Sequence, residues 1–383
     1  MRMVKVSLGV RSYTISIGNN LLSRLGAECK RLRLGRRCAV LTDDQVAPHY
    51  GPPALQALRE AGFEPTLLTV PAGETSKGLA TVADCYDQLA AHRIERKSFL
   101  VALGGGVVGD LAGFLAATYL RGIDFVQVPT TLLGQVDSSV GGKVGVNLKA
   151  GKNLVGAFWQ PRAVLCDLGT LDTLPQREFR SGLAEVVKYG IIYDAELFAR
   201  LEQVTVKILA RDPEVLSAVV ARCCQIKAAV VAEDETETGS RAILNFGHTL
   251  GHALEAISGY GQYLHGEAIA LGQVFAAELS HRLLALPARE VERVRALFDK
   301  IGLPTRVKLG AADREKLVEA MRHDKKVSGG VIRFVLANKI GQVSFGQEVP
   351  LDLMEKVLSG SPRPEPAVAP SPPAARRNPQ PAD

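Results

Sequence analysis

Short apolar runs that end in turn residues alternate with helical segments through the first half of the chain. These runs lie at 37–44, 65–74, 98–106, 123–131 and 163–171. Strands buried in a parallel sheet are nearly continuous apolar runs, and helices between them cover the sheet. Near the start, the alternating runs VKVSL and YTISIG predict a hairpin. The pattern therefore predicts an α/β domain built on a parallel sheet.

The pattern changes at about Glu178. Strand-like runs nearly vanish there, and apolar residues recur at helical spacing, as in EVLSAVVARCCQIKAAVVAED. A strand pair is expected only near 331–346. We predict a first domain over 1–177 and a mainly α-helical domain over 178–360. The final segment, 361–383, holds eight of the twenty prolines and has no regular period, so a disordered tail is predicted.

Composition places the chain among ordinary soluble proteins. It is 46% hydrophobic and 22% charged, no run approaches the length of a membrane span, and the start lacks the apolar core of a signal peptide. The six cysteines form no CxxC pair, which indicates reduced thiols and a cytoplasmic protein without a membrane partner. The net charge of +6 favours an anionic small molecule, because the densest basic patch, 30–37, has no interleaved aromatic residues for nucleic acid.

A glycine-rich turn follows the run at 98–106. Gly104, Gly106 and Gly109 satisfy GxGxxG, and glycines there let backbone N–H groups approach a pyrophosphate at a helix N-terminus. The alternative is a tight turn that needs small residues. The motif follows about the third strand of the sheet instead of the first, so it is weak evidence for an ordinary dinucleotide fold.

Polar residues also stand where several predicted strands end. Because ligands collect at the carboxyl ends of parallel strands, these residues are candidate nucleotide contacts, although each alone is equally well a surface turn residue. They are Asp43, Glu74, Lys77, Asp110, Thr130 and Thr131.

Three of the seven histidines lie within eighteen residues in the second domain. His248 and His252 are four apart and share a helix face, and His265 follows. Glu185, in an apolar helical stretch with Lys188, offers a carboxylate. One carboxylate and two imidazoles make a catalytic metal site with an open position, and spacing does not choose between His248 and His252. The alternative for each histidine is a hydrogen-bonded core residue.

Basic residues recur around these groups. Lys143 and Lys152 lie in glycine-rich surroundings that suit phosphate binding, although each basic residue alone is a solvated charge in the simpler interpretation. The others are Lys188, Lys227, Arg241, Lys325 and Lys326. Together the clusters predict a nucleotide, a metal and an anionic substrate.

The chain resembles the 3-dehydroquinate synthase family over residues 5–358. The resemblance rests on PAGETSK, LGGGVVGDLAGFLAATYLRG, PTTLLGQVDSSVGGKVGVNL, GKNLVGAFWQP, TLPQREFRSGLAEVVKYG, RAILNFGHTLGHALE, HGEAIALG and DKK, in this order. It implies an α/β Rossmann-like dinucleotide-binding domain followed by a mainly α-helical metal-binding domain, with the active site between them, and a homodimer.

The resemblance also implies the reaction. The substrate, 3-deoxy-D-arabino-heptulosonate 7-phosphate, carries a phosphate and a carboxylate. In the family, bound NAD+ oxidises a ring hydroxyl, phosphate is eliminated, the ketone is reduced again, and ring opening with aldol closure gives 3-dehydroquinate. Oxidation acidifies the adjacent carbon, and a Zn2+ or Co2+ ion stabilises the developing oxyanion.

Matched position by position, the resemblance implies a role for each site residue. Glu185, His248 and His265 match the metal ligands, which leaves His252 facing the substrate. NAD contacts match Asp43, Glu74, Lys77, Gly105, Gly106, Val107, Val108, Gly109, Asp110, Thr130, Thr131, Lys143, Lys152, Thr170, Leu171, Thr173, Leu174 and Glu178. Catalytic positions match Asp137, Lys188, Lys227, Glu237, Arg241, Asn245 and His252. Further substrate contacts match Lys143, Asn153, one of Lys325 and Lys326, and Arg121, which reaches the neighbouring subunit's phosphate site. Position 170 is Thr where some relatives carry an aromatic residue.

Three other functions compete with this one. A sugar phosphate cyclase acting on glucose 6-phosphate or sedoheptulose 7-phosphate would not need carboxylate partners such as Lys227 and Arg241. A metal-dependent polyol dehydrogenase would consume NAD stoichiometrically. A binding module would keep the pockets without the chemistry, yet every motif position holds a chemically competent residue.

Overall fold

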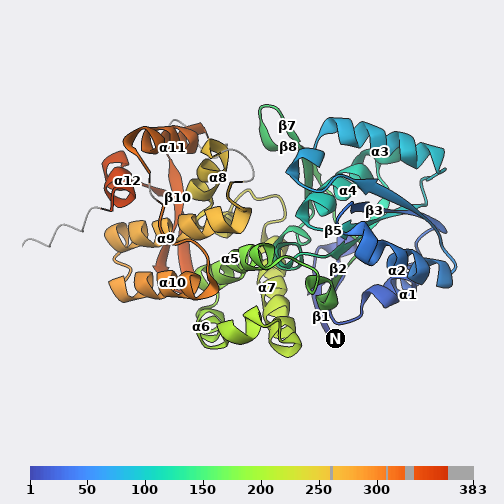
Figure 1. The fold of residues 1–383 in the computed structure, drawn as a ribbon, viewed down its shortest axis with the longest axis horizontal. Helices are drawn as coiled ribbons and strands as arrows, with labels where there is room; N and C mark the ends of the chain where they lie inside the picture. Colours follow the sequence, from blue (N-terminus) through green and yellow to red (C-terminus); the bar gives the residue numbers. More distant parts are fainter. Residues whose placement is uncertain (259–261, 308, 324–331, 361–383) are drawn as a thin grey trace, which may run out of the picture.

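The computed structural model describes residues 1–258, 262–307, 309–323 and 332–360, and shows two lobes side by side (Figure 1). One lobe is a sheet with helices on both faces, and the other is mainly helical. This is the predicted fold class. The predicted tail at 361–383 lies outside the described residues.

A seven-stranded sheet forms the first lobe, in the order β1-β2-β9-β6-β5-β3-β4. The strands β2, β9, β6, β5, β3 and β4 run parallel to their neighbours, while β1 pairs with β2 as the predicted antiparallel hairpin. The strands are β1 (Arg2–Val6), β2 (Tyr13–Gly18), β3 (Arg37–Asp43), β4 (Glu64–Val70), β5 (Phe99–Gly104), β6 (Asp124–Pro129) and β9 (Ala163–Asp167). Each of the five apolar runs therefore contains one parallel strand.

Alternate residues of the inner strands face different helices. Cys38 and Val40 of β3 belong to a core with α1 and α2, whereas Ala39 and Leu41 belong to a core with α3 and α4. The helices are α1 (Leu25–Arg31), α2 (Ala47–Glu60), α3 (Leu79–Ala91) and α4 (Gly106–Thr118). Both faces of the sheet are covered, which is why its strands are apolar throughout.

The glycine-rich segment after β6, whose surroundings were predicted to suit phosphate binding, folds as a hairpin. It forms a second antiparallel pair, β7 (Lys143–Leu148) with β8 (Gly151–Phe158). Gly145 lies opposite Gly156, and a Cβ on Gly156 would be 2.3 Å from a backbone oxygen of Val144. Glycines are needed here for the close approach of the two strands, which the sequence pattern alone did not separate from approach to a ligand.

The second lobe contains eight helices within the described residues. They are α5 (Gln176–Ile192), α6 (Ala195–Leu209), α7 (Pro213–Glu233), α8 (His248–Ile257), α9 (His265–Leu283), α10 (Ala288–Ile301), α11 (Ala311–His323) and α12 (Leu351–Leu358). The predicted strand pair is β10 (Arg333–Lys339) with β11 (Gln342–Glu348). Aspartates cap two of the helices, since Asp194 accepts from Leu197 N and Asp212 accepts from Val215 N.

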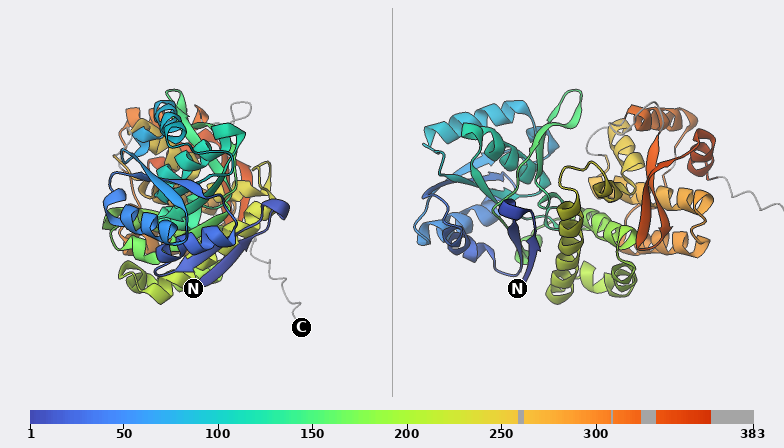
Figure 2. Two further views of the ribbon diagram at one scale, coloured as in Figure 1. Left: turned by 90° about the vertical axis from the view of Figure 1, so that its right-hand side faces the viewer. Right: turned by 180° about the vertical axis from the view of Figure 1, so that it is seen from behind.

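The two lobes share one core along α7. Val4, Val6 and Ile15 of the opening hairpin belong to the same apolar cluster as α5 and α7, and Figure 2 shows α7 beside this hairpin. By length and hydropathy α7 would pass as a membrane span, contrary to the expectation that no run comes near one, but 61% of its apolar window is buried inside the fold. It is therefore explained as the core helix that holds the hairpin against the helical lobe.

Candidate active site

The glycine-rich turn joins β5 to α4 as predicted. Gly105 is the N-cap of α4, which begins at Gly106. A Cβ on Gly104 would be 2.7 Å from the Val108 side chain, and one on Gly109 would be 2.9 Å from Oε1 of Gln127. The turn is thus packed tightly on its inner side, while the N-terminal amides of α4 lie at the carboxyl end of the sheet, where an anion is favoured.

Polar side chains at the strand ends form a network beside this turn. Lys77 is buried, and its Nζ donates to Oδ2 of Asp110 at 2.5 Å and to Oδ1 of Asn153 at 2.6 Å. Burial raises the pKa of the Asp110 carboxyl, and the Lys77 ammonium partly offsets this. Glu74 accepts from Nδ2 of Asn147 at 2.8 Å. The predicted residues Glu74, Lys77 and Asp110 therefore belong to one network at the carboxyl end of the sheet.

Three other strand-end residues form hydrogen bonds with backbone groups of nearby residues. Asp43 Oδ1 accepts from the amides of Gln45 and Val46 at 3.0 and 2.9 Å. The Thr131 hydroxyl oxygen accepts from Gly134 N at 3.0 Å, and Thr130 is buried with its amide donating to Gly104 O at 2.9 Å. These bonds shape the loops that follow β3 and β6.

A five-residue π-helix, Gly134–Ser138, carries Asp137 into the space between the lobes. The Asp137 carboxylate accepts from Nζ of Lys227 and from the hydroxyl of Tyr189, both at 2.8 Å, and Nζ of Lys188 is 3.9 Å away. Such π segments occur often at functional sites because they turn a side chain out of helical register. Asp137 therefore accepts hydrogen bonds from both α5 and α7.

Charges in this cluster balance each other. Burial opposes ionisation of Asp137, but the Lys227 and Lys188 ammonium groups hold its pKa well below the usual value. Burial lowers the pKa of Lys227 despite Asp137. Burial also acts to lower the pKa of Lys188, but Glu185 and Asp137 outweigh it and raise that pKa. Asp137 and Lys188 are therefore held in their charged forms, which suits binding of a charged ligand.

A cavity of about 460 Å³ opens beside Asp137. Residues predicted for the nucleotide and residues predicted for the substrate line it together. The predicted ones are Asp110, Asp137, Lys143, Asn153, Lys227, Glu237 and Arg241. One cavity thus brings together positions from both lobes that are up to 131 residues apart in the sequence, from Asp110 to Arg241.

Glu185, His248 and His265 converge deep in the second lobe. One ligand atom from each lies within 4.8 Å of the others, and Oε1 of Glu185 is 3.6 Å from Nε2 of His248 and 3.4 Å from Nε2 of His265. The Glu185 carboxylate is fully buried, forms an ion pair with Lys188, and neither of its oxygens has a well-formed hydrogen bond among the described residues. Buried carboxylate and imidazole donors left in this state suit a divalent cation.

Both histidines of the predicted metal site present Nε2 to this centre. His248 Nδ1 lies 3.2 Å from Phe246 O, and His265 Nδ1 lies 3.4 Å from Oε2 of Glu255. A proton on Nδ1 donated to these oxygens leaves the Nε2 lone pair for a metal. Burial acts to lower the pKa of His265, but Glu185 and Glu255 outweigh it and raise that pKa to about 10 in the metal-free chain.

His252 stands beside this centre and outside the ligand set. Its ring is 5.2 Å from the His248 ring and 6.3 Å from the His265 ring, centroid to centroid. Asn245, at the end of a 3-10 turn before α8, donates to Oε1 of Glu237 at 2.8 Å. The segment 245–255 therefore contributes His248 to the metal cluster and, through Asn245, contacts Glu237 of the cavity wall.

The β7–β8 hairpin carries lysines to acids of the second lobe. Lys143 forms an ion pair with Glu237, and Lys152 Nζ donates to Oε1 of Glu255 at 3.1 Å. Both acids belong to the helical lobe, so these pairs cross the space between the lobes. Lys152, predicted to contact NAD, is thus placed against the metal-binding lobe.

Several predicted residues lie away from the cavity. Val108 and Leu171 are core residues, and the buried Thr170 donates its hydroxyl to Asp167 O at 2.7 Å. Thr173 Oγ1 is 2.9 Å from the Tyr50 hydroxyl. Glu178 lies on the first turn of α5, where burial raises the pKa of its carboxyl. The remaining cofactor candidates not yet described, Val107 and Leu174, are half-buried. Lys325 and Lys326 lie outside the described residues.

Arg121 is placed at the opposite end of the strands, before the amino end of the central strand β6. It is exposed just before β6 begins, in a turn where Leu120, Arg121 and Gly122 have φ values of 53°, 70° and 120°. Two consecutive non-glycine residues at positive φ are strained. Its own cavity lies at the other end of the strands.

The sequence interpretation missed Tyr189, Glu255 and the cavity-lining Ser138. Tyr189 follows Lys188 and gave no signal in a helix full of apolar residues. Glu255 follows His248 by seven residues, a spacing that returns to the same helix face, so that periodicity was a usable signal.

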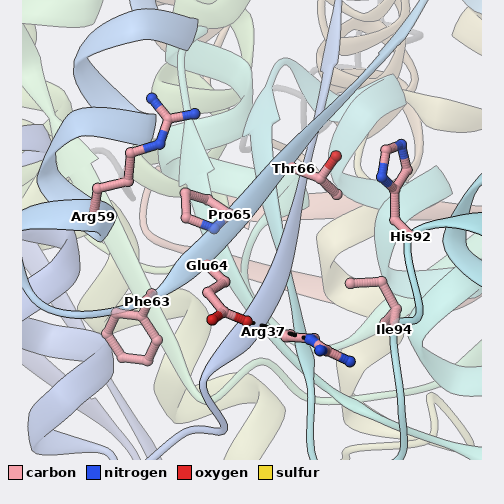
Figure 3. A pocket seen from close by; sticks show the side chains of 8 residues that line it. All are labelled: Arg37, Arg59, Phe63, Glu64, Pro65, Thr66, His92 and Ile94. Atoms are coloured by element: carbon pink, nitrogen blue, oxygen red, sulfur yellow. Dashed lines mark hydrogen bonds and ion pairs between the residues drawn. The ribbon is translucent and has the colours of Figure 1, made fainter.

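Another surface pocket, of about 470 Å³, lies at the amino ends of β3 and β4 (Figure 3). Arg37, Arg59 and His92 line it, but Arg37 already pairs with Glu64 and Glu95. None of the predicted site residues is there.

Comparisons with known proteins agree with this geometry. Residues 67–181 match the family model described as 3-dehydroquinate synthase N-terminal, and residues 182–327 match the one described as 3-dehydroquinate synthase C-terminal. The chain is 52% identical over 345 residues to a 3-dehydroquinate synthase of Geobacter metallireducens, which covers 90% of this chain and 95% of the relative.

Solved structures give the same fold. A 2-deoxy-scyllo-inosose synthase complexed with carbaglucose-6-phosphate, NAD+ and Co2+ aligns with a TM-score of 0.83 at 26% identity, over 93% of this chain and 99% of that one. A 2-epi-5-epi-valiolone synthase from Streptomyces hygroscopicus with NAD+ and Zn2+ bound aligns with a TM-score of 0.83 at 28% identity, over 92% and 98%.

Proposed function

This chain belongs to the 3-dehydroquinate synthase family, and on that premise we propose that the cavity between its lobes converts 3-deoxy-D-arabino-heptulosonate 7-phosphate to 3-dehydroquinate and phosphate. The enzyme is a lyase that uses NAD+ and one divalent metal, Zn2+ or Co2+. The observation that supports the site is a single cavity in which Lys143, Lys227 and Arg241 meet beside the Glu185, His248 and His265 cluster.

Cationic side chains bind the doubly anionic substrate. Arg241 is almost fully buried, with Nη1 donating to Glu235 O and Nη2 to Gly141 O at 3.3 Å. Its guanidinium is therefore held in one orientation, as bidentate binding of a carboxylate needs. Lys227 stands beside it, and Lys143 enters from the β7–β8 hairpin, so three basic side chains line the cavity together with Asp110, Asp137 and Glu237.

Glu185, His248 and His265 hold the metal. When bound, NAD+ supplies reversible hydride transfer and the metal supplies a Lewis acid at the reacting oxygen. Lys188 stays paired with Glu185 and Asp137 in the buried wall, and it keeps positive charge where the substrate oxyanion develops. Asn245 and Glu237 stand in hydrogen-bond contact as a polar pair at the substrate side.

His252 is the residue for proton movement at the leaving phosphate. Its ring lies 5.2 Å from the His248 ring and 6.3 Å from the His265 ring, and it is outside the cluster of Glu185, His248 and His265. The His252 imidazole can therefore face the substrate without binding the metal. An imidazole is a common general acid and base, and this one takes up or delivers a proton during elimination.

The NAD side of the site lies next to the cavity, at the carboxyl ends of the strands. It is formed by the glycine turn, Glu74, Lys77, the threonines of the loop after β6, and Asp110, which also lines the cavity. Asp43, at the end of β3, is the ribose partner, and the α4 N-terminus receives the pyrophosphate. The boundary between NAD and metal domains is drawn near residue 177, and α5, which begins at Gln176, supports it.

The functional unit is a cytoplasmic homodimer. Arg121 supports this assembly, because it is exposed at the end of the strands away from its own cavity, where only another subunit could use it as a phosphate contact.

The rival that a specific observation favours is another sugar phosphate cyclase, since a 2-deoxy-scyllo-inosose synthase shares the whole fold. Purified, metal-loaded protein with NAD+ is incubated separately with the heptulosonate 7-phosphate, glucose 6-phosphate and sedoheptulose 7-phosphate, and released phosphate is measured. We expect release from the heptulosonate alone. Release only from one of the other two assigns the rival. Steady growth of NADH absorbance with a polyol would instead indicate a dehydrogenase.

A further inference from the structure

We infer that Glu255 is a positioning residue for the metal: it fixes the His265 ring and joins that ligand to Lys152 of the NAD-binding lobe. The two oxygens of its carboxylate have different partners. Oε2 lies 3.4 Å from Nδ1 of His265, and Oε1 accepts from Nζ of Lys152 at 3.1 Å. The side chain is mostly buried, with 11% of its surface exposed.

His265 needs such a partner because of its place in the chain. It is the first residue of α9, after the N-cap Leu264, so no preceding helical turn supports its ring. On one side Nε2 faces Glu185 at 3.4 Å, and on the other Nδ1 faces Glu255. The ring is held between two carboxylates, of which only Glu185 is on the metal side.

His248 shows the contrast. Its Nδ1 is 3.2 Å from the backbone oxygen of Phe246, two residues earlier, so its ring is oriented by its own segment. His265 depends on a side chain of α8 instead. A carboxylate that accepts the Nδ1 proton fixes the ring orientation and makes the imidazole a more basic ligand.

The second contact extends across the lobes. Lys152 lies on β8, in the hairpin that projects from the first lobe toward α8 (Figure 1), and its ammonium neutralises the Glu255 carboxylate. A movement of the hairpin therefore acts on the orientation of a metal ligand without passing through the substrate.

The inference rests on the proposed function for the reaction it serves, but its test measures metal binding. Metal-free Glu255→Ala, Glu255→Gln and Lys152→Met proteins are titrated with Co2+ against a competing chelator, and the visible Co2+ absorption spectrum is recorded. We expect Glu255→Ala to lose about 10–100-fold in Co2+ affinity and to change the spectrum. Glu255→Gln should recover part of the loss, because its amide oxygen still accepts from Nδ1–H.

Lys152→Met should weaken Co2+ binding less than Glu255→Ala. Glu202→Gln is the matched control. It removes the charge of a carboxylate that forms an ion pair with Arg293 on α10, away from the metal cluster. Unchanged affinity and spectrum in both Glu255 variants would overturn the inference, and Glu255→Gln decides alone where Glu255→Ala does not fold. Because no substrate is used, an inactive parent protein with these metal effects would refute the proposed function and leave the inference standing.

Discussion

The ammonium nitrogen of Lys227, on α7 of the helical lobe, lies 2.8 Å from Oδ1 of Asp137 and 2.6 Å from the backbone carbonyl oxygen of Asp137. Asp137 belongs to the π-helix that follows β6. This contact joins the two lobes at the floor of the cavity. Only 7% of the Lys227 side chain and 24% of the Asp137 side chain are exposed, so each charge depends strongly on the other.

Removing Lys227 should therefore reduce stability and activity together. Breaking a buried ion pair by losing one partner costs about 3–5 kcal/mol, and the lower end is expected because Tyr189 and Lys188 remain near Asp137. Urea unfolding of Lys227→Met measures the loss, and the phosphate-release assay should show a fall in kcat/KM. Lys207→Met, exposed on α6, is the control. The double variant with Asp137→Asn should lose less than the sum of the two single losses, and additive losses would contradict the pairing.

The two histidines on α8 should separate by metal content. His248→Ala removes one of three ligands and should lose most bound metal on dialysis, whereas His252→Ala should keep most of its metal and lose turnover. Metal analysis by mass spectrometry and phosphate release are measured on the same preparations. Equal metal loss in both variants would show that His252 is a ligand.

Metal binding should strengthen as the pH rises. In the metal-free chain the pKa of His265 is raised to about 10, because Glu185 and Glu255 outweigh burial, so a proton must leave before Nε2 binds. Release of one proton makes affinity rise about tenfold per pH unit below that pKa. Co2+ titrations at several pH values in this range, with an indicator dye in weak buffer, measure both effects. An affinity independent of pH would contradict the assignment of His265.

The same pKa shift has a consequence for the metal-free fold. The folded pKa of His265 exceeds the ordinary value of about 6.5. Its contribution to the free energy of unfolding is therefore fully present below about pH 6.5 and disappears as the pH rises through about 10. Urea unfolding of chelator-treated protein across this range should show stability falling with pH, and bound metal should remove the trend.

Adding a methyl group between α8 and α9 should damage the metal site. A Cβ on Gly272 would be 1.9 Å from Gly247 O, so the helices that carry His248 and His265 would have to separate. Overpacking of this kind costs about 1–3 kcal/mol, and more where backbone is contacted. We expect Gly272→Ala to unfold at lower urea and bind Co2+ more weakly.

Gly51→Ala is the matched control, since its Cβ would meet only Leu67 at ordinary contact distance. This substitution in α2 should change stability by less than about 1 kcal/mol, because the better helix preference of alanine is offset by crowding of its Cβ against Pro52. Equal behaviour of the two variants would mean that close packing of α8 on α9 does not hold the metal ligands in place.

Local patterns in the sequence were enough to predict the strands, the helical lobe and the residue types of the site. Apolar runs such as 98–106 predicted β5, and motifs in a fixed order indicated the family, because buried strands and ligand contacts each restrict which residues are allowed at neighbouring positions. The β7–β8 hairpin was not predicted. Its glycines allow close strand pairing, but the same glycine-rich pattern suits phosphate binding equally well.

Only the tertiary structure decided which of these residues meet. The sequence determined that Glu185, two histidines and several lysines were present, but spacing could not choose His248 over His252, because both point from one helix face. The packing of α5 against α9 and of α8 against α9 placed Glu185 near Nε2 of His248 and His265, and the hairpin set Lys152 on Glu255. Contacts between residues far apart in the chain are fixed by how the elements pack, and a local pattern carries no information about that geometry.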